Sequence, residues 1–510
     1  MGSLRNIGPS IWTATSSETS FPRVEGELTV DVAVVGGGIT GLTTALLLLR
    51  EGSSVALIEA DRIASSTTSY STAKLTSLHG LTYTSIADEH GEESARLYGE
   101  ANEAAIQKVV QLANDHNIGC DLERMPAYTY TTDQGVIQKI EEEVELAGRL
   151  GLPATFTTET GLPFEVAAAI RFDDQVMFHP RKYCQALAGL VVQEGGRIFE
   201  QTVVTAIEEG RPCTVVTGTR RVRADHVVQA TQLPFYDPFG FFTSNYPSQS
   251  YGMAFPVDGE VPPGVYLSAD TPTRSIRPYR DGEQTYLIVG GEGHKVARDP
   301  ATSQRYRALE DWAKDNFDVG RPAFSWSAHD YLPVDGLPYI GRLTPDTDRL
   351  WVATGFKKWG LTNGTAAAMI LSDTIAGKPN PWAKTFDSIR LKPKPSAKAF
   401  LRKQIELEER RRANPPIVGV PAPEGMQLAP GEAGLFKTAD HKVAAYRDGE
   451  GQLHTFSAVC SHMGCQVAFN SAEKTWDCPC HGSRFDVEGK VVHGPATNPL
   501  EKVNVIGSTG

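Results

Sequence analysis

The sequence lacks any long apolar run. No stretch of its 510 residues approaches the roughly 18 uninterrupted apolar residues of a membrane-spanning helix, and aliphatic runs such as Ala45–Leu49 are short. Residues 1–20 also lack the apolar core that a signal peptide requires. We therefore expect a cytoplasmic protein with no membrane span.

Basic residues are also fewer than acidic ones. Lys and Arg number 49 against 61 Asp and Glu, so the formal net charge is −12. Nucleic acids and anionic membranes select basic surfaces, so this balance argues against nucleic acid as the main partner. The remaining composition, 40% hydrophobic and 22% charged, is ordinary for a soluble globular protein long enough for more than one domain.

Cysteine is scarce, with seven residues, but four of them gather in one place. Cys120, Cys184 and Cys213 are scattered, and we interpret them as ordinary buried thiols. The others stand near two histidines in the last fifth of the chain, in the order Cys460, His462, Cys465, Cys478, Cys480 and His481. In a cytoplasmic chain this clustering indicates a metal centre rather than a disulfide scaffold.

A βαβ unit is predicted near the start of the chain. Residues 30–35 are typical of a buried strand, 36–41 (GGGITG) of a tight turn into a helix that ends at Arg50, and 55–58 of a second strand followed by Glu59. Glycines at this turn allow close approach of a pyrophosphate, the helix N-terminus supplies N–H groups, and the acidic residue accepts hydrogen bonds from a ribose. The unit predicts a dinucleotide site without separating FAD from NAD.

The rest of the chain contains no second dinucleotide motif. We expect helices at 85–117 and 134–150 and a further helix that ends near Ala376. Single strands are expected at 127–132 and 350–354, and several short strands within 197–230 and 251–289. Gly290–Gly293 is interpreted as a turn at a strand end, because no helical run follows it. Electrons are therefore expected to come from an organic substrate rather than from a built-in NAD(P)H module.

Three further regions carry a family resemblance: 65–76 (SSTTSYSTAKLT), 224–231 (ADHVVQAT), and 332–341 with 353–364 (LPVDGLPYIG and ATGFKKWGLTNG). With the βαβ unit they make residues 30–378 resemble the D-amino-acid oxidase and glycine/sarcosine oxidase superfamily of FAD enzymes. The resemblance implies a Rossmann-like α/β FAD-binding domain interleaved with an α/β substrate domain on a mixed sheet. Thr362 or Asn363 would open a helix whose N-terminus stabilises negative charge on the reduced flavin. The implied FAD-binding residues are Gly36, Gly38, Ile39, Thr40, Gly41, Glu59, Ala60, Arg62, Thr67, Thr68, Ser71, Thr72, Ala73, Lys74, Val204, Ala230, Thr231, Gly355, Phe356, Gly360, Leu361 and Thr362.

The resemblance also implies the chemistry: a hydride passes from the carbon beside an amine to flavin N5, which oxidises a C–N bond. Lys74 occupies the place of a basic residue in related sarcosine oxidases and is the first catalytic candidate. Arg277, Tyr251 and Lys358 are further candidates, with Arg277 as a bidentate clamp for a carboxylate. His79 matches a covalent flavin attachment site poorly. For each of these residues a purely structural role is the alternative.

The C-terminal Cys and His residues resemble the Rieske signature, C-x-H followed by C-x-x-H. The resemblance implies that Cys460 and Cys478 hold one iron of a 2Fe–2S cluster and that His462 and His481 hold the other. Zinc is the alternative metal, because its ligands are also Cys and His. Cys465 and Cys480 match the pair that forms a disulfide in the Rieske proteins of cytochrome bc complexes.

Two other positions bear on the potential of that cluster. Ser483 matches a serine that hydrogen-bonds a bridging sulfide, whereas Phe485 stands where the respiratory subgroup has a tyrosine. Loss of that tyrosine hydroxyl removes a hydrogen bond that favours the reduced cluster, so we expect a potential below that of the respiratory proteins.

The domain order suggests how the two centres work together. We expect an N-terminal extension (1–29), an FAD-binding domain in three parts (30–84, 176–235, 331–390), a substrate domain in two parts (85–175, 236–330), a charged linker helix (391–416) and an all-β Rieske domain (417–510). A fused one-electron cluster would let a two-electron flavin discharge to an external acceptor such as a ferredoxin. The alternatives are a reductase fed through the cluster, and a non-catalytic electron carrier or redox sensor.

Overall fold

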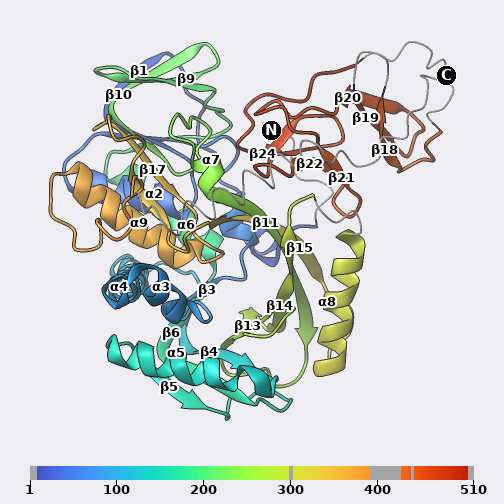
Figure 1. The fold of residues 1–510 in the computed structure, drawn as a ribbon. Helices are drawn as coiled ribbons and strands as arrows, with labels where there is room; N and C mark the ends of the chain where they lie inside the picture. The colour runs from blue at the N-terminus through green and yellow to red at the C-terminus, as the bar shows by residue number, and fades with distance from the viewer. Residues whose placement is uncertain (1–7, 298–301, 391–426, 438–441, 504–510) are drawn as a thin grey trace.

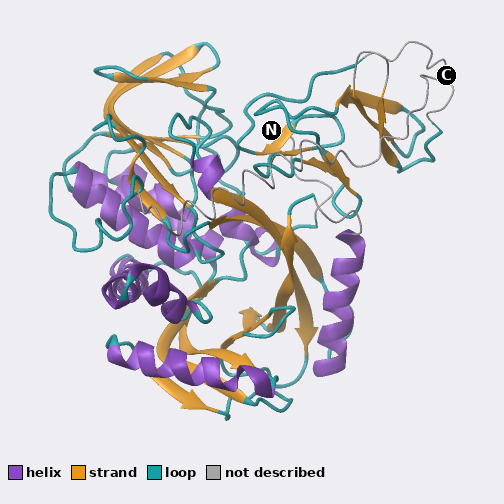
Figure 2. Ribbon diagram, in the orientation of Figure 1, coloured by secondary structure: helices purple, strands orange, loops and turns teal. Residues whose placement is uncertain are grey.

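The computed structural model of the chain describes residues 8–297, 302–390, 427–437 and 442–503. Four β-sheets form its framework, and helices pack on the two larger ones (Figures 1 and 2). The linker helix expected at 391–416 lies outside the described residues.

The first large sheet has eight strands and carries the predicted βαβ unit. Strands β7, β2, β1, β10 and β17 run parallel in this order, and β16 lies antiparallel to β17 at the edge. Helix α2 packs against both α6 and α9, so the apolar residues of the central strands are buried as in other parallel sheets. The elements are β1 (Glu27–Val35), α2 (Ile39–Arg50), β2 (Val55–Ile58), α6 (Pro180–Gln193), β7 (Arg197–Phe199), β8 (Ala206–Glu208), β9 (Cys213–Thr217), β10 (Arg220–Gln229), β16 (Tyr339–Arg342), β17 (Leu350–Thr354) and α9 (Gly360–Ile375).

The second large sheet has nine mixed strands, with β15, β11, β14, β13, β12, β4, β6 and β3 in order and β5 beside β6. Helix α5 packs on β5 and β6, and α8 packs on β11 and β14 (Figure 1). The strands of this sheet and the helices and 3-10 turns between them are η1 (Thr67–Tyr70), β3 (Lys74–Leu75), α3 (Thr82–His90), α4 (Glu92–Asp115), β4 (Glu123–Thr131), η2 (Gln134–Val136), α5 (Ile137–Arg149), β5 (Ala154–Thr157), β6 (Ala168–Met177), α7 (Phe241–Ser244), β11 (Asn245–Val257), β12 (Val265–Ser268), β13 (Arg274–Asp281), β14 (Gln284–Lys295), α8 (Thr302–Asn316) and β15 (Phe324–Pro333).

The C-terminal part is all β, as expected. It has a three-stranded and a four-stranded sheet, and it lies beside β11 and β15 in Figure 1. The strands are β18 (Ala433–Lys437), β19 (Lys442–Arg447), β20 (Leu453–Ser457), β21 (Ala468–Asn470), β22 (Thr475–Asp477), β23 (Arg484–Phe485) and β24 (Val491–His493). At the other end of the chain, the short helix α1 (Ile11–Ala14) packs Ile11 and Trp12 into the main core.

Two sequence predictions of local structure were wrong. The single helix expected at 85–117 is two helices, α3 and α4, because Gly91 between them has a φ of +87° that a continuous helix excludes. Gly290–Gly293 is not a turn but part of β14, hydrogen-bonded to β11 and β13. A Cβ at Gly291 would lie 2.7 Å from the carbonyl oxygen of Thr273, so the glycines mark a close approach inside the sheet.

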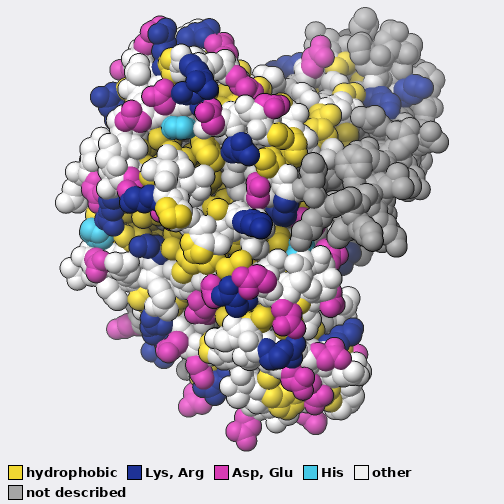
Figure 3. Space-filling model, turned by 60° about the vertical axis from the view of Figure 1, so that its left-hand side comes forward, with side chains coloured by type: hydrophobic (Ala, Val, Ile, Leu, Met, Phe, Trp, Pro, Cys, Tyr) yellow, Lys and Arg dark blue, Asp and Glu magenta, His cyan; other side chains and the backbone are white. Residues whose placement is uncertain are grey.

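The surface carries both charges intermingled. Figure 3 shows Lys and Arg side chains interspersed with Asp and Glu over the face in view, without a large field of one sign. Within the described ranges, no helix combines the length and apolarity needed to cross a membrane.

Candidate functional site

A cavity of about 1420 Å³ forms where the two large sheets and the C-terminal domain meet. Residues 35–40 of the glycine motif line one end, and residues 250–252, 290–293 and 326–330 of the second sheet line another part. Residues 492–497 of the C-terminal domain complete the wall. The predicted dinucleotide site and the predicted cluster domain therefore share one cavity.

The glycine motif is shaped by backbone contacts that leave no room for side chains. A Cβ at Gly36, whose φ is +113°, would lie 2.5 Å from the carbonyl oxygen of Ala230. A Cβ at Gly41 would lie 1.9 Å from the carbonyl oxygen of Gly36. Gly38 has no side chain to cap α2, and the N–H of Ile39 donates only a long 3.4 Å hydrogen bond to Oγ1 of Thr68, so this helix N-terminus can accept an anion such as a pyrophosphate.

Glu59 is held rigidly at the end of β2. Its Oε2 accepts a 2.6 Å hydrogen bond from the N–H of Gly37, and its Oε1 accepts one of 2.8 Å from the N–H of Asp61. Burial is the main cause that raises the pKa of this carboxyl, and the two N–H donors oppose it. A fixed carboxylate on the cavity wall is the group that an adenosine ribose requires.

Most of the predicted FAD-binding residues line the cavity. Three do not: Gly41, Gly355 and Thr362. Thr362 hydrogen-bonds the Nε2 of His79 at 3.0 Å, behind the wall. Helix α9 begins at Gly360, two residues before the predicted start, and Trp359 caps it without a side-chain hydrogen bond. The lining residues of the predicted set are Gly36, Gly38, Ile39, Thr40, Glu59, Ala60, Arg62, Thr67, Thr68, Ser71, Thr72, Ala73, Lys74, Val204, Ala230, Thr231, Phe356, Gly360 and Leu361.

Lys74 is a buried lysine on the cavity wall. Its Nζ donates hydrogen bonds to Oγ of Ser275 at 2.6 Å and to the carbonyl oxygen of Tyr266 at 3.0 Å, and it lies 5.5 Å from the ring of Trp359. In the described part of the chain no carboxylate forms an ion pair with it. Burial, and secondly the charge of Arg277, lowers the pKa of Lys74 to about 7.

Tyr251 and Lys358 also reach the cavity. The hydroxyl of Tyr251 lies 2.8 Å from Nε2 of His294, and Nζ of Lys358 donates a 2.7 Å hydrogen bond to Oγ of Ser250. The Lys358 side chain is accessible to the cavity space although protein surrounds it, and this burial lowers its pKa.

Arg277 does not reach the cavity. It is fully buried, and its guanidinium donates to the carbonyl oxygens of Thr72, Ala73 and Pro278. The structure therefore places it behind the Ser/Thr-rich loop, out of reach of a substrate carboxylate. His79 is engaged similarly: its Nδ1 lies 2.5 Å from the Tyr98 hydroxyl, and its ring is stacked on Trp359.

Sequence reasoning missed Asp330, which lies on the cavity wall. Burial raises the pKa of this carboxyl to about 6, and the backbone N–H of Tyr331 and the charge of Lys358 oppose the shift. The available signal was its position two residues before the segment 332–341. A single carboxylate in a strand has no spacing pattern that would distinguish it.

The four predicted cluster ligands come together at one tip of the C-terminal domain. The thiols of Cys460 and Cys478 are within hydrogen-bonding contact, and this contact is the main cause that lowers the pKa of Cys460. The rings of His462 and His481 have centroids 5.1 Å apart. Nδ1 of His462 is buried without a partner among the described residues. Two thiols lie beside two imidazoles, and one ring nitrogen has no hydrogen-bond partner among the described residues. This arrangement fits a cluster with two Cys and two His ligands.

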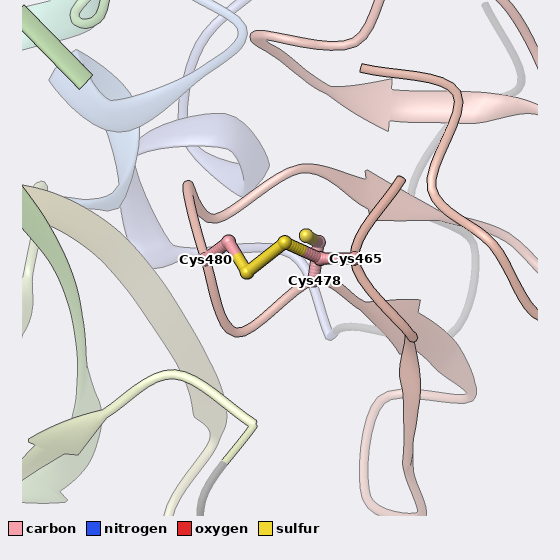
Figure 4. A group of neighbouring side chains, drawn as sticks. All are labelled: Cys465, Cys478 and Cys480. Carbon is pink, nitrogen blue, oxygen red and sulfur yellow. A yellow bond between two sulfur atoms is a disulfide. The ribbon is translucent and has the colours of Figure 1, made fainter. Parts of the chain in front are cut away.

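The predicted disulfide is confirmed. Cys465 and Cys480 are bonded, with sulfur atoms 2.03 Å apart, and so tie the two ligand loops together (Figure 4). The sulfur of Cys478 lies within 4.8 Å of both. This trio is not a metal site of its own, because bonded sulfurs offer no thiolate. Ser483 accepts a 3.0 Å hydrogen bond from the N–H of Ala496 and also contacts the Cys460 thiol.

Comparison with known proteins gives two family matches. The sequence model of FAD dependent oxidoreductases (DAO) matches residues 31–374, and that of the Rieske [2Fe-2S] domain matches residues 420–504.

Similar proteins share one or both parts. The protein YhfW of Bacillus subtilis (strain 168), named for a Rieske 2Fe-2S iron–sulfur centre, is 34% identical over 499 residues, which are 97% of each chain. Gamma-glutamylputrescine oxidoreductase of Escherichia coli (strain K12) is 23% identical over 72% of this chain and 88% of its own. Among solved structures, glycine oxidase from Geobacillus kaustophilus superposes with a TM-score of 0.61 at 19% identity over 72% of this chain and 100% of its own, which shows a shared fold.

Proposed function

The chain belongs to the FAD dependent oxidoreductase family and carries a C-terminal Rieske [2Fe-2S] domain, and from this we propose that it oxidises the C–N bond of an amine or amino acid. Its cofactors are FAD and a 2Fe–2S cluster. The electrons pass from the flavin to the cluster and then to an external one-electron acceptor, such as a ferredoxin.

One observation carries the proposal: residues 492–497 of the Rieske domain line the cavity that contains the FAD-binding motif. The contribution of the cluster domain to this cavity supports an exchange of electrons between the two centres. The name of the Escherichia coli relative describes an oxidoreductase of gamma-glutamylputrescine, a molecule with C–N bonds, and this supports an amine substrate.

Several residues of this chain would hold the FAD. The N–H groups at the start of α2, after Gly38, would bind the pyrophosphate, and Glu59 would accept a hydrogen bond from the ribose. The N-terminus of α9 at Gly360, which has no side-chain cap, would favour negative charge on a reduced flavin bound beside it. When bound, FAD supplies the hydride acceptor that no side chain can provide.

Lys74 is our candidate for the proton transfer. A substrate ammonium must lose a proton before its carbon can release a hydride, because the nitrogen lone pair stabilises the product imine. A lysine with a pKa of about 7 is neutral in part at physiological pH, and it can accept that proton at Nζ. Asp330 and Lys358 supply opposite charges on the same wall, suited to orient a polar substrate.

Amine-dependent reduction of a one-electron dye without oxygen tests the proposal. The native protein should reduce the dye with an active amine, whereas Cys478→Ser should still bleach its flavin with that amine but lose dye reduction. Cys213→Ser, which removes a buried thiol distant from the ligands, is the control. Failure of every amine to bleach the flavin would overturn the proposal and favour the reductase direction.

A further inference from the structure

Strand β15 lies beside both the cavity and the cluster loops. Its hydroxyl-bearing Tyr331 donates a 2.7 Å hydrogen bond to the carbonyl oxygen of the ligand His481, and Nδ1 of His329 lies 3.3 Å from the carbonyl oxygen of Gly482. The neighbouring positions of the strand line the cavity: Ala328, His329, Asp330 and Leu332. One strand therefore contacts both the cavity and the loop that carries a cluster ligand.

His329 also connects to the cavity through its backbone. Its carbonyl oxygen accepts a 2.7 Å hydrogen bond from Nε2 of Gln232 and a 3.4 Å one from Oγ1 of Thr67, and both residues line the cavity. A chain of hydrogen-bonded groups therefore runs from the cavity wall through His329 to Gly482, next to the ligand His481.

The Rieske domain is anchored in this position by buried polar contacts. Glu473, which is 1% exposed, accepts hydrogen bonds from Nε2 of Gln249 at 3.0 Å and from the Tyr306 hydroxyl at 3.2 Å. Oγ1 of Thr302 donates to Oδ1 of Asn470 at 2.8 Å. Separation of the domains would break these hydrogen bonds and expose their buried partners to water.

The two histidine ligands differ in burial. Both contact Phe242 on the flavoprotein side, with ring centroids 5.0 Å away for His481 and 6.4 Å away for His462. His481 is 2% exposed, whereas His462 is half-buried and is flanked by the exposed side chains of Val459 and Met463. His481 is therefore the ligand closer to the flavoprotein part, and His462 is the one closer to solvent.

We propose that electrons enter the cluster at His481 through β15, with His329 and Tyr331 as positioning residues, and leave at His462, while the Rieske domain stays docked. This rests on the proposed exchange between flavin and cluster. Oxidation of one C–N bond releases two electrons and the cluster holds one, so two transfers follow each turnover and each delivers one electron to the external acceptor. No covalent bond forms or breaks in these transfers.

The test drives the flavin without an amine. Illumination with a sacrificial electron donor reduces the flavin under anaerobic conditions, and rapid-freeze EPR then follows the arrival of electrons at the cluster. We expect Tyr331→Phe and His329→Phe to slow that arrival several-fold and to shift the cluster g-values, because the backbone that holds His481 loses a support. Tyr83→Phe is the matched control, since it removes a buried 2.7 Å bond from a tyrosine hydroxyl to the carbonyl of Ser77 far from the cluster.

The outcomes separate the two proposals. If electrons reach the cluster as fast in Tyr331→Phe and in His329→Phe as in Tyr83→Phe, the proposed route through β15 is wrong. Arrival of photochemical electrons in the native protein, with no amine able to reduce the flavin, would leave the route standing and overturn the amine chemistry.

A second variant tests the fixed docking. Thr302→Cys with Asn470→Cys places two thiols where the side chains now touch. Mass spectrometry first shows that the cross-link has formed. The rate of electron transfer from flavin to cluster in the cross-linked protein should then equal the rate in the same variant with chemically blocked thiols. Arrest of transfer in the linked form would show that the domain must move, which contradicts the proposal.

Discussion

Nζ of Lys74 lies 2.6 Å from Oγ of Ser275, which leaves this buried lysine with neutral hydrogen-bond partners on the cavity wall. Because its pKa is lowered to about 7, Lys74 is protonated below that pH and neutral above it. We expect the rate of anaerobic flavin reduction to rise with pH through about 7 in the native protein. Lys74→Met should be slower by roughly 10²-fold and lack this rise, because general-base catalysis contributes that much.

Stopped-flow measurements of the flavin band across pH check this expectation. Lys358→Met is the comparison, because it removes another cavity lysine that has a carboxylate, Asp330, as its charged neighbour. A Lys74→Met profile that keeps the rise near pH 7 would assign the titration to another group.

Arg277 supports the Ser/Thr-rich loop from behind. Arg277→Met leaves the carbonyl oxygens of Thr72 and Ala73 without their donor, so we expect weaker FAD retention and a loss of roughly 1–3 kcal/mol in unfolding free energy. With FAD in excess, KM for the substrate should be unchanged. Arg171→Met removes an exposed ion pair with Asp173 and should change neither FAD retention nor the unfolding free energy. A raised KM with full FAD retention would instead support the carboxylate clamp.

Features formed by neighbouring residues could be predicted from the sequence. The strand, glycine turn and helix around Gly36–Gly41 are contiguous, and so are the two ligand loops that carry Cys460 and Cys478. Their geometry depends on local backbone conformation and on spacing, and both are visible in the chain itself.

Features formed by pairing between distant strands could not. Asp330 reaches the cavity, and Tyr331 reaches His481, only because β15 pairs with β11 and the Rieske domain packs on the resulting edge. The glycines at 290–293 have the composition of a turn, yet pairing on both sides holds them in a strand. Arg277 was misplaced for the same reason, since the sequence does not show which face of β13 is closed.

The disulfide should stabilise the cluster loops. Cys465 and Cys480 are 15 residues apart, and a loop of that length gains about 3 kcal/mol from closure in the chain-entropy account. We expect Cys465→Ser with Cys480→Ser to lower the unfolding free energy of the Rieske domain by about that amount and to lose iron on dilution. Iron analysis and thermal unfolding check this. A double variant with native iron content and stability would contradict it.

Two buried residues should set the cluster potential in opposite directions. Ser483 contacts Cys460 with its hydroxyl, so Ser483→Ala should lower the potential, whereas Phe485→Tyr should raise it by adding a donor. A redox titration followed by EPR measures both. Phe469→Tyr, in the same core, should leave the potential unchanged. An unchanged potential in Phe485→Tyr would mean that the added hydroxyl does not reach a cluster sulfur.

The most direct measurement is an anaerobic titration of the native protein with a panel of secondary amines and amino acids, followed by visible absorption and low-temperature EPR. The account predicts that an active amine bleaches the flavin and that a reduced Rieske signal then appears. If no amine reduces the flavin, while dithionite or a reduced ferredoxin reduces the cluster and then the flavin, electrons run in the opposite direction and the account is contradicted.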